Sequence, residues 1–227
     1  MQPKPANPLI AAIDRTDLSE ATTLAESLSG SVGMLKIGLE LFWAHGPDVV
    51  RSFSALGPVF VDAKLHDIPN TVEHAAANIA RLGVAMLNVH ALGGEAMMHA
   101  ALEGAERGAK EAGVAKPLVT AVTVLSSHTG EELASPASLA FEAKASGLDG
   151  VVVSGDDVRE VRSVCGEDFV LVVPGIRPAG TNGDDQARIL TPAEAIERGA
   201  DYLVVGRPIT RASDPAAAAR SIVEQIA

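Results

Sequence analysis

The segment VDAKLHDIPNT, residues 61–71, holds the densest group of charged side chains that could do chemistry. Asp62 and Lys64 are two residues apart on a predicted strand, so both side chains face the same side of it. Asp67 follows this strand, and Lys36 lies on the preceding predicted strand. Two ammonium groups and two carboxylates can then alternate in space, which reduces the cost of burying them. Because an apolar layer would tie strands together more cheaply, we interpret these four charges as an active site.

Two arginines follow the last two predicted strands and indicate a phosphate site. Arg177 lies in PGIRPAG and Arg207 in VVGRPIT. A guanidinium group binds phosphate through two parallel hydrogen bonds, and Gly206 lets backbone amides approach the anion. We expect Gln186, which closes the irregular segment 175–186, to reach the same anion from a mobile lid.

Sequence motifs for other kinds of catalysis are missing from the chain. There is no HExxH, CxxC or EF-hand spacing for a metal ion, and the six histidines are scattered. Neither a GxSxG elbow nor a Walker loop is present. The sequence therefore predicts chemistry by charged side chains, with no metal site.

Short aliphatic runs alternate with helix-like segments along the whole chain. The runs recur roughly every 28 residues, which is the period of a βα unit. Helix signals lie between them. Asp17 begins and Gly30 follows the segment 17–29, and Pro69 begins the segment 69–82. The predicted strands are 8–14, 33–38, 59–65, 85–90, 117–124, 149–154, 169–175 and 201–206.

Eight such units predict an α/β fold, a (β/α)₈ TIM barrel that forms a single domain over residues 1–227. A doubly wound open sheet is the second choice, since no GxGxxG turn follows the first strand. Active sites of these barrels lie at the carboxyl ends of the strands. The polar residues of the predicted strands gather at those ends: Asp14, Lys36, Asp62, Lys64, Asn88, His90 and Thr123.

The composition limits the possible partners and the location of the protein. The 227 residues carry a formal charge of −11, which argues against a nucleic-acid partner held by its phosphates. One cysteine excludes an internal disulfide. No apolar run approaches the ~20 residues of a membrane span, and the start MQPKPANP does not resemble a signal peptide. We therefore expect a cytoplasmic protein with no membrane contact.

Taken together, the motifs resemble those of the orotidine 5′-phosphate decarboxylase family in its bacterial form, over essentially the whole chain. The resemblance rests on the segments IDRTD, LKIGLELF, VDAKLHDIPNT, NVHALGG, TAVTVLSS, VVPGIRPAGTNGDDQ and DYLVVGRPITRASDP. It implies decarboxylation of orotidine 5′-monophosphate (OMP) to UMP in pyrimidine biosynthesis. It also implies that neither a metal nor an organic cofactor is needed.

The resemblance assigns roles by matching position to Asp14, Lys36, Asp62 and Lys64. Asp14 and Lys36 match residues that hold the ribose hydroxyls. Asp62 and Lys64 match the central pair beside C6 of the pyrimidine, with the lysine as proton donor.

Further positions match residues that complete the site. Asp67 and Thr71 match residues that reach into the site of the other subunit, which implies a homodimer. Thr123 and Ser127 match residues that lie near the pyrimidine ring. The contacts to the phosphate and the lid are matched by Arg177, Gln186, Gly206 and Arg207.

Two other functions stay open at the level of the sequence. A related sugar-phosphate decarboxylase or aldolase of the same barrel group shares the D-x-K-x-x-D strand, but uses Mg²⁺ and has a glutamate where Lys36 stands. A non-catalytic nucleotide-binding barrel would be expected to lose the catalytic charges, and all four are present.

Overall fold

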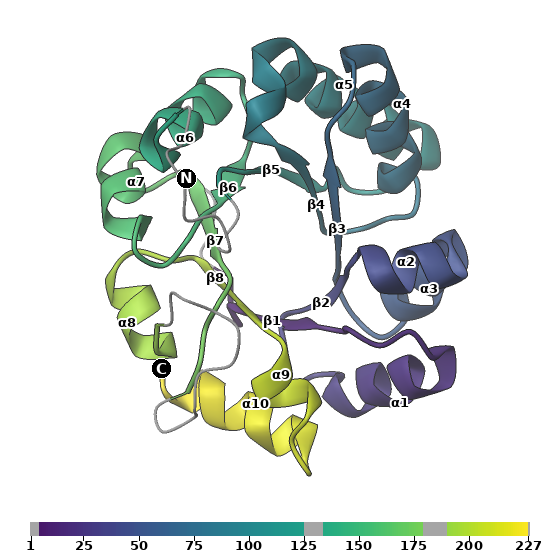
Figure 1. The fold of residues 1–227 in the computed structure, drawn as a ribbon. Coiled ribbons are helices and arrows are strands. Elements are labelled where there is room, and N and C mark those ends of the chain that lie inside the picture. The colour runs from purple at the N-terminus through teal and green to yellow at the C-terminus, as the bar shows by residue number, and fades with distance from the viewer. Residues whose placement is uncertain (1–4, 125–133, 179–189, 227) are drawn as a thin grey trace.

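The protein folds into a closed barrel of eight parallel strands, seen almost along its axis in Figure 1. The computed structural model describes residues 5–124, 134–178 and 190–226. Each strand pairs with its neighbours in the chain, and β8 closes the barrel by pairing with β1. The strands are β1 Leu9–Ala12, β2 Met34–Ile37, β3 Val59–Leu65, β4 Met86–His90, β5 Leu118–Val122, β6 Gly150–Val152, β7 Val170–Val173 and β8 Tyr202–Val205. The predicted barrel is therefore confirmed, and an open doubly wound sheet is excluded.

The helices surround the strands on the outside of the barrel (Figure 1). The segments 17–29 and 69–82, predicted as helical, each contain a helix. No helix was predicted over residues 39–54, where the structure has two. The helices are α1 Leu18–Leu28, α2 Leu39–His45, α3 Pro47–Ser54, α4 Pro69–Ala80, α5 Gly94–Ala112, α6 Pro136–Ala145, α7 Val158–Cys165, α8 Pro192–Glu197, α9 Arg207–Thr210 and α10 Pro215–Glu224, with a 3₁₀ turn η1 at Ala91–Gly93.

Local sequence signals explain where the helices begin and end. The Asp17 side chain accepts a hydrogen bond from the backbone N–H of Glu20 and caps α1. Gly46 has φ of 65° and separates α2 from α3, because a left-handed residue ends one helix and Pro47 starts the next. Pro69 likewise occupies the first turn of α4, directly after the loop that follows β3.

Apolar side chains fill both faces of the strands, as expected for parallel strands covered by helices. Outward residues such as Val61 pack against the helices in the larger core. Inward residues form a second, smaller cluster inside the barrel, which includes Met34, Phe60, Met86 and Tyr202. This inner cluster closes one end of the barrel, so the space for a ligand lies at the carboxyl ends of the strands.

All eight strands belong to this one barrel. That the chain is a single domain from residue 1 to 227 stays a prediction. Within the described residues, none of the helices combines the length and the apolar character that crossing a membrane requires.

Candidate active site

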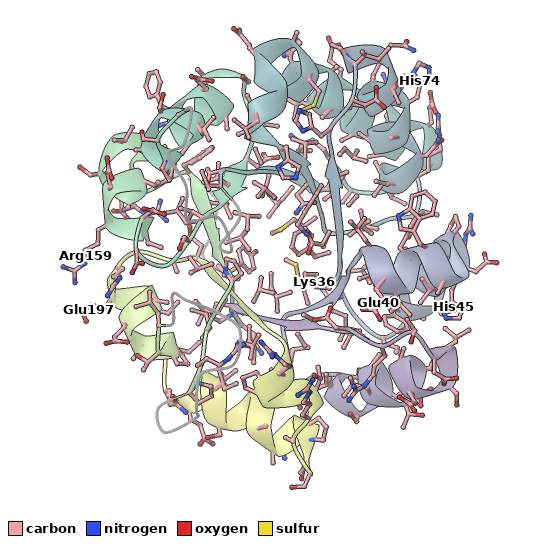
Figure 2. The ribbon with its side chains drawn as sticks, viewed as in Figure 1. Lys36, Glu40, His45, His74, Arg159 and Glu197 are labelled. Carbon is pink, nitrogen blue, oxygen red and sulfur yellow. The ribbon has the colours of Figure 1, made fainter. Side chains whose placement is uncertain are left out.

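A cavity of about 350 Å³ opens at the carboxyl ends of the strands. This volume lies in the range of sites for small molecules. Figure 2 shows Lys36 inside the ring of strands, whereas its other labelled residues lie on the surrounding helices. The lining residues are Ala12, Asp14, Lys36, Phe60, Asp62, Lys64, Val122, Val124, Val152, Val153, Ser154, Pro174, Gly175, Arg177, Val204, Gly206 and Arg207.

A continuous row of alternating charges crosses one side of this cavity. The Lys36 Nζ atom lies 3.7 Å from Asp14 Oδ1 and 3.1 Å from Asp62 Oδ2. The Lys64 Nζ atom lies 2.6 Å from Asp62 Oδ1. Asp62 therefore sits between two ammonium groups that come from neighbouring strands, β2 and β3. We refer to Asp14, Lys36, Asp62 and Lys64 as the charge row.

The charge row keeps its central carboxylate ionised. Burial by itself raises the pKa of Asp62, but the charges of Lys36 and Lys64 and hydrogen bonds from Lys64 and Asn88 outweigh burial and lower the pKa from 3.8 to about 2. Lys36 is 8% exposed, so its ammonium group depends on these carboxylates for compensation. The row therefore places fixed, oriented charge in a largely buried site.

The backbone at Lys64 departs from regular strand geometry. Its φ of 49° makes it the one non-glycine residue with positive φ in the described part of the chain. The pairing of β3 with β4 also shifts register between Val61 and Leu65. The side chains still alternate between the two faces of the strand. Asp62 and Lys64 line the cavity, whereas Ala63 packs toward the helices. The irregular backbone lets the long side chain of Lys64 fold back onto Asp62.

The predicted phosphate residues line the same cavity. Arg177 is 6% exposed, and its backbone N–H donates to the carbonyl of Leu190 at 2.9 Å. Its guanidinium group also donates to the carbonyl of Ile176 at 3.0 Å. Gly206 and Arg207 lie where β8 leads into α9. The structure thus brings Arg177, Gly206 and Arg207 to the cavity that holds the charge row.

Some of the predicted site residues lie elsewhere. Asp67 and Thr71 are exposed and outside the cavity lining, and Asp67 accepts a hydrogen bond from the backbone N–H of Ile68 at 2.6 Å. Within the described part of one chain, Asp14 continues the row beside Lys36, and Asp67 is not part of it. That Asp67 joins the array of the other subunit stays a prediction.

Thr123, predicted to contact the pyrimidine ring, is not among the described residues that line the cavity. Thr123 is 1% exposed, and its hydroxyl donates to the carbonyl of Val152. Its neighbours Val122 and Val124 line the cavity instead. Ser127, and also Gln186 of the predicted lid, lie outside the described residues. Their ligand contacts stay predictions.

Two further polar residues stand at the site. From the sequence, Asn88 was named only among the polar strand ends, and Ser154 was missed. Asn88 on β4 is fully buried, and its amide contacts both Asp62 and the backbone of Lys64. Ser154 is 5% exposed and lines the cavity, and its hydroxyl has no hydrogen-bond partner among the described residues. Ser154 also ends a predicted strand, and that position is the signal that could have indicated it.

Comparisons with known proteins show the family of the chain. The sequence model of the "Orotidine 5′-phosphate decarboxylase / HUMPS family" matches residues 7–222. The chain is 50% identical to the orotidine 5′-phosphate decarboxylase of Paramagnetospirillum magneticum, over 97% of this chain and 98% of that protein. It is 47% identical to the enzyme of the same name from Moorella thermoacetica, over 96% of this chain and 91% of that protein.

A solved structure is similar over the same extent. The crystal structure of orotidine 5′-phosphate decarboxylase from Lactobacillus acidophilus has a TM-score of 0.85 and 37% identity, and the match covers 97% of this chain and 99% of that chain. The resemblance drawn from the motifs is thereby confirmed. With its closed barrel, its charge row and these relatives, the chain belongs to the orotidine 5′-phosphate decarboxylase / HUMPS family.

Proposed function

We propose that the chain decarboxylates OMP to UMP in pyrimidine biosynthesis, with C6 of the pyrimidine beside Lys64. The observation that carries this proposal is the ionised Asp62 held between Lys36 and Lys64 in a cavity that also contains two arginines. Relatives at 46–50% identity that carry the name orotidine 5′-phosphate decarboxylase support it.

Lys64 supplies the positive charge and the proton in the proposed reaction. The bond between C6 and the carboxylate breaks, CO₂ leaves, and the electron pair stays on C6 in the plane of the ring. This pair cannot delocalise into the π system, so an ammonium group at C6 stabilises it and then protonates it. Asp62 accepts a hydrogen bond from Lys64 Nζ at 2.6 Å and so holds the ammonium group in place until the transfer. Water then returns a proton to the lysine.

Asp62 has a second part in the proposal. A substrate carboxylate at C6 would lie close to this ionised side chain, and two like charges at short range raise the energy of the bound substrate. Loss of CO₂ removes one of these charges. The low pKa of Asp62, about 2, supports this arrangement because the side chain stays negative at neutral pH.

The remaining groups hold the nucleotide. We assign the ribose hydroxyls to Asp14 and Lys36, and the phosphate to Arg177, Gly206 and Arg207, with Gln186 closing over it. The cavity wall between these two ends is apolar apart from Ser154, to whose hydroxyl we assign a polar atom of the pyrimidine. Direct contacts of Thr123 and Ser127 with the ring belong to the proposal as well. Phosphate binding far from C6 can drive closure over the substrate and exclude water.

A homodimer completes the proposed site. Asp67 and Thr71 do not line the cavity of their own chain, which supports a role at a neighbouring copy. An apolar groove of about 280 Å³ lies beside them between α2 and α4. Trp43 at this groove is 80% exposed, and nearby Ile68 is 65% exposed. Exposed apolar surface of this kind is typical of an interface, and a second copy is the occupant we propose.

Mixing two inactive variants tests the shared site. Lys64→Ala removes the proton donor of a site, and Asp67→Ala removes the residue that its partner supplies. In a mixed dimer one site carries both changes and the other carries neither. Random mixing should therefore restore about a quarter of the wild-type activity. No recovery in a mixture shown to exchange subunits would contradict the shared site.

The activity itself is tested with purified protein and OMP, by following loss of absorbance and formation of UMP. We expect turnover in the presence of EDTA, because no step uses a metal. Turnover that EDTA abolishes would favour the metal-dependent sugar-phosphate enzymes of the same barrel group. UMP binding without turnover of OMP would favour a non-catalytic nucleotide-binding barrel. The cytoplasmic location expected from the sequence stays a prediction.

A further inference from the structure

Asn88 is a buried polar residue directly behind the charge row. It lies on β4, is fully buried, and is not part of the cavity lining. Both ends of its side-chain amide are nevertheless bonded to the proposed catalytic pair. The Oδ1 atom accepts the backbone N–H of Lys64 at 2.7 Å, and the Nδ2 atom donates to Asp62 Oδ1 at 2.7 Å. The orientation of the amide is fixed, since a backbone N–H only donates and an ionised carboxylate only accepts.

The first bond replaces a missing ladder bond at Lys64. Between Val61 and Leu65 the pairing with β4 advances from Leu87 to Val89, so four steps on β3 match two on β4. The residues between them cannot form a regular parallel ladder. Asn88 takes up the N–H of Lys64, which would otherwise be a buried donor without a partner. Left-handed backbone disfavours a residue with a side chain by about 1–2 kcal/mol, so this conformation needs such support.

The second bond orients the carboxylate of Asp62. Its Oδ1 atom receives Lys64 Nζ at 2.6 Å and Asn88 Nδ2 at 2.7 Å, while Oδ2 faces Lys36 Nζ at 3.1 Å. Asn88 thus limits rotation of the carboxylate, and each oxygen stays directed at one ammonium group. As a neutral donor, the amide does so without adding a charge to the row.

We propose that Asn88 is a positioning residue of the reaction, which fixes the backbone of Lys64 and the carboxylate plane of Asp62 without touching the substrate. The inference rests on the proposed decarboxylase function, and it adds a residue on β4 to a site whose described lining comes from other strands. A displacement of about 1 Å at a reacting group can lower the rate by about 100-fold. Loss of Asn88 should therefore lower kcat while leaving UMP affinity nearly unchanged.

Two variants separate the two bonds. Asn88→Ala removes both, and we expect a fall in kcat of about 100-fold with the dissociation constant of UMP within about threefold of wild type. Asn88→Asp keeps an acceptor for the N–H of Lys64 but replaces the donor to Asp62 with a carboxyl oxygen. Two carboxyl groups in contact raise the pKa of one of them. When the introduced carboxyl is protonated, it donates to Asp62 as the amide does.

The pH profile gives the distinguishing readout. The ratio of kcat in Asn88→Asp to kcat in wild type should rise about tenfold or more as the pH falls from about 8 to about 5. Thr120→Val is the matched control, because Thr120 pairs with Asn88 across β4 and β5, is equally buried, and bonds only to the carbonyl of Leu87 among the described contacts. It should keep wild-type kcat and a flat ratio. UMP titration and thermal unfolding verify that each variant is folded.

The outcomes are separable. Wild-type protein without OMP turnover would overturn the proposed function, and the inference with it. Wild-type turnover combined with Asn88 variants that keep kcat within about threefold, or that lose it together with UMP affinity, would overturn the inference alone. A ratio of kcat in Asn88→Asp to kcat in wild type that does not change with pH would also overturn the inference. In that case the donor to Asp62 would not matter for the rate, as expected if Asn88 had a purely structural role.

Discussion

The half of the barrel formed by β1–β4 differs from the half formed by β5–β8 in where its polar groups stand. In the first half, Lys36 and Asp62 occupy positions on the strands themselves, and their charged atoms are 3.1 Å apart. In the second half, Arg177 and Arg207 lie in segments that follow the strands, and the strand residues at the cavity are valines. One half thus carries rigid charge, and the other carries anion-binding groups on connections.

This difference separates the two tasks of the site. Lys36 is held by backbone ladders on both sides, and Asp62 by its contacts with Lys36, Lys64 and Asn88. Such fixed positions suit groups that must stabilise a developing charge. Segments after strands tolerate glycine and variable length, which suits the approach of a phosphate and the closure of a loop. Changes in the first half should therefore lower kcat or stability, whereas changes in the second half should lower the affinity for the phosphate.

The largest effect is expected for Lys64→Ala. The variant loses both the cation at C6 and the proton donor, so kcat should fall by about 10⁴-fold or more. UMP affinity should change by less than about tenfold, because the phosphate contacts remain. Steady-state assays and UMP titration measure the two quantities. A variant with turnover within about tenfold of wild type would refute the role of Lys64.

Asp62→Asn tests the stability of the charge row. It leaves Lys36 and Lys64 without their shared carboxylate, and breaking a buried ion pair lowers the free energy of unfolding by about 3–5 kcal/mol. Asp48→Asn is the control, since Asp48 is paired with Arg51 at the surface and its side chain is 90% exposed. Urea unfolding compares the two, and equal losses would contradict a stabilising row.

The pH dependence of this difference has a definite sign. The pKa of Asp62 is lowered in the folded state from 3.8 to about 2, so its contribution is complete above about 3.8 and is lost as the pH falls toward 2. The gap in unfolding free energy between wild type and Asp62→Asn should be constant from neutral pH down to about 4 and then shrink. A gap that narrows already near neutral pH would contradict the low pKa.

Arg207→Ala tests the second half. We expect kcat/KM for OMP to fall by about 100-fold, mainly through KM. With orotidine, which lacks the phosphate, the same variant should differ from wild type by less than about threefold. Equal losses for both substrates would place Arg207 outside the phosphate site.

The smallest effect is expected for Ser154→Ala. UMP affinity should fall by up to about tenfold, while stability should stay equal or rise, because a buried hydroxyl that has no partner among the described residues disfavours folding. Ser146→Ala is the control, since the Ser146 hydroxyl is buried and donates to the carbonyl of Glu142 in α6, so this variant should lose stability and keep UMP affinity. Unchanged UMP affinity in Ser154→Ala would remove Ser154 from the site.

Most of the fold could be predicted because it depends on local signals. The eight aliphatic runs coincide with β1–β8, and caps such as Asp17 and Pro69 mark helix starts. The two helices over residues 39–54 were missed, since they are short and are separated only by Gly46. Their formation depends on burial of one face against the barrel, which a single sequence does not show.

The site was predictable where strand alternation decides the direction of a side chain. Asp62 and Lys64 were correctly expected to face the same side, and Lys36 to meet them from β2. The positive φ at Lys64 and the role of Asn88 depend on a register shift between β3 and β4, which arises only when the barrel closes. Asp14, expected at the same strand ends, lies beside Lys36 because the closed barrel brings the end of β1 next to β2. The contribution of Asp67 from the other subunit stays a prediction.

A crystal structure of the protein with UMP tests the central claim most directly. We expect C6 of the pyrimidine within about 3.5 Å of Lys64 Nζ, and the phosphate between Arg177 and Arg207. A nucleotide bound with its phosphate on the charge row, or with C6 directed away from Lys64, would contradict it.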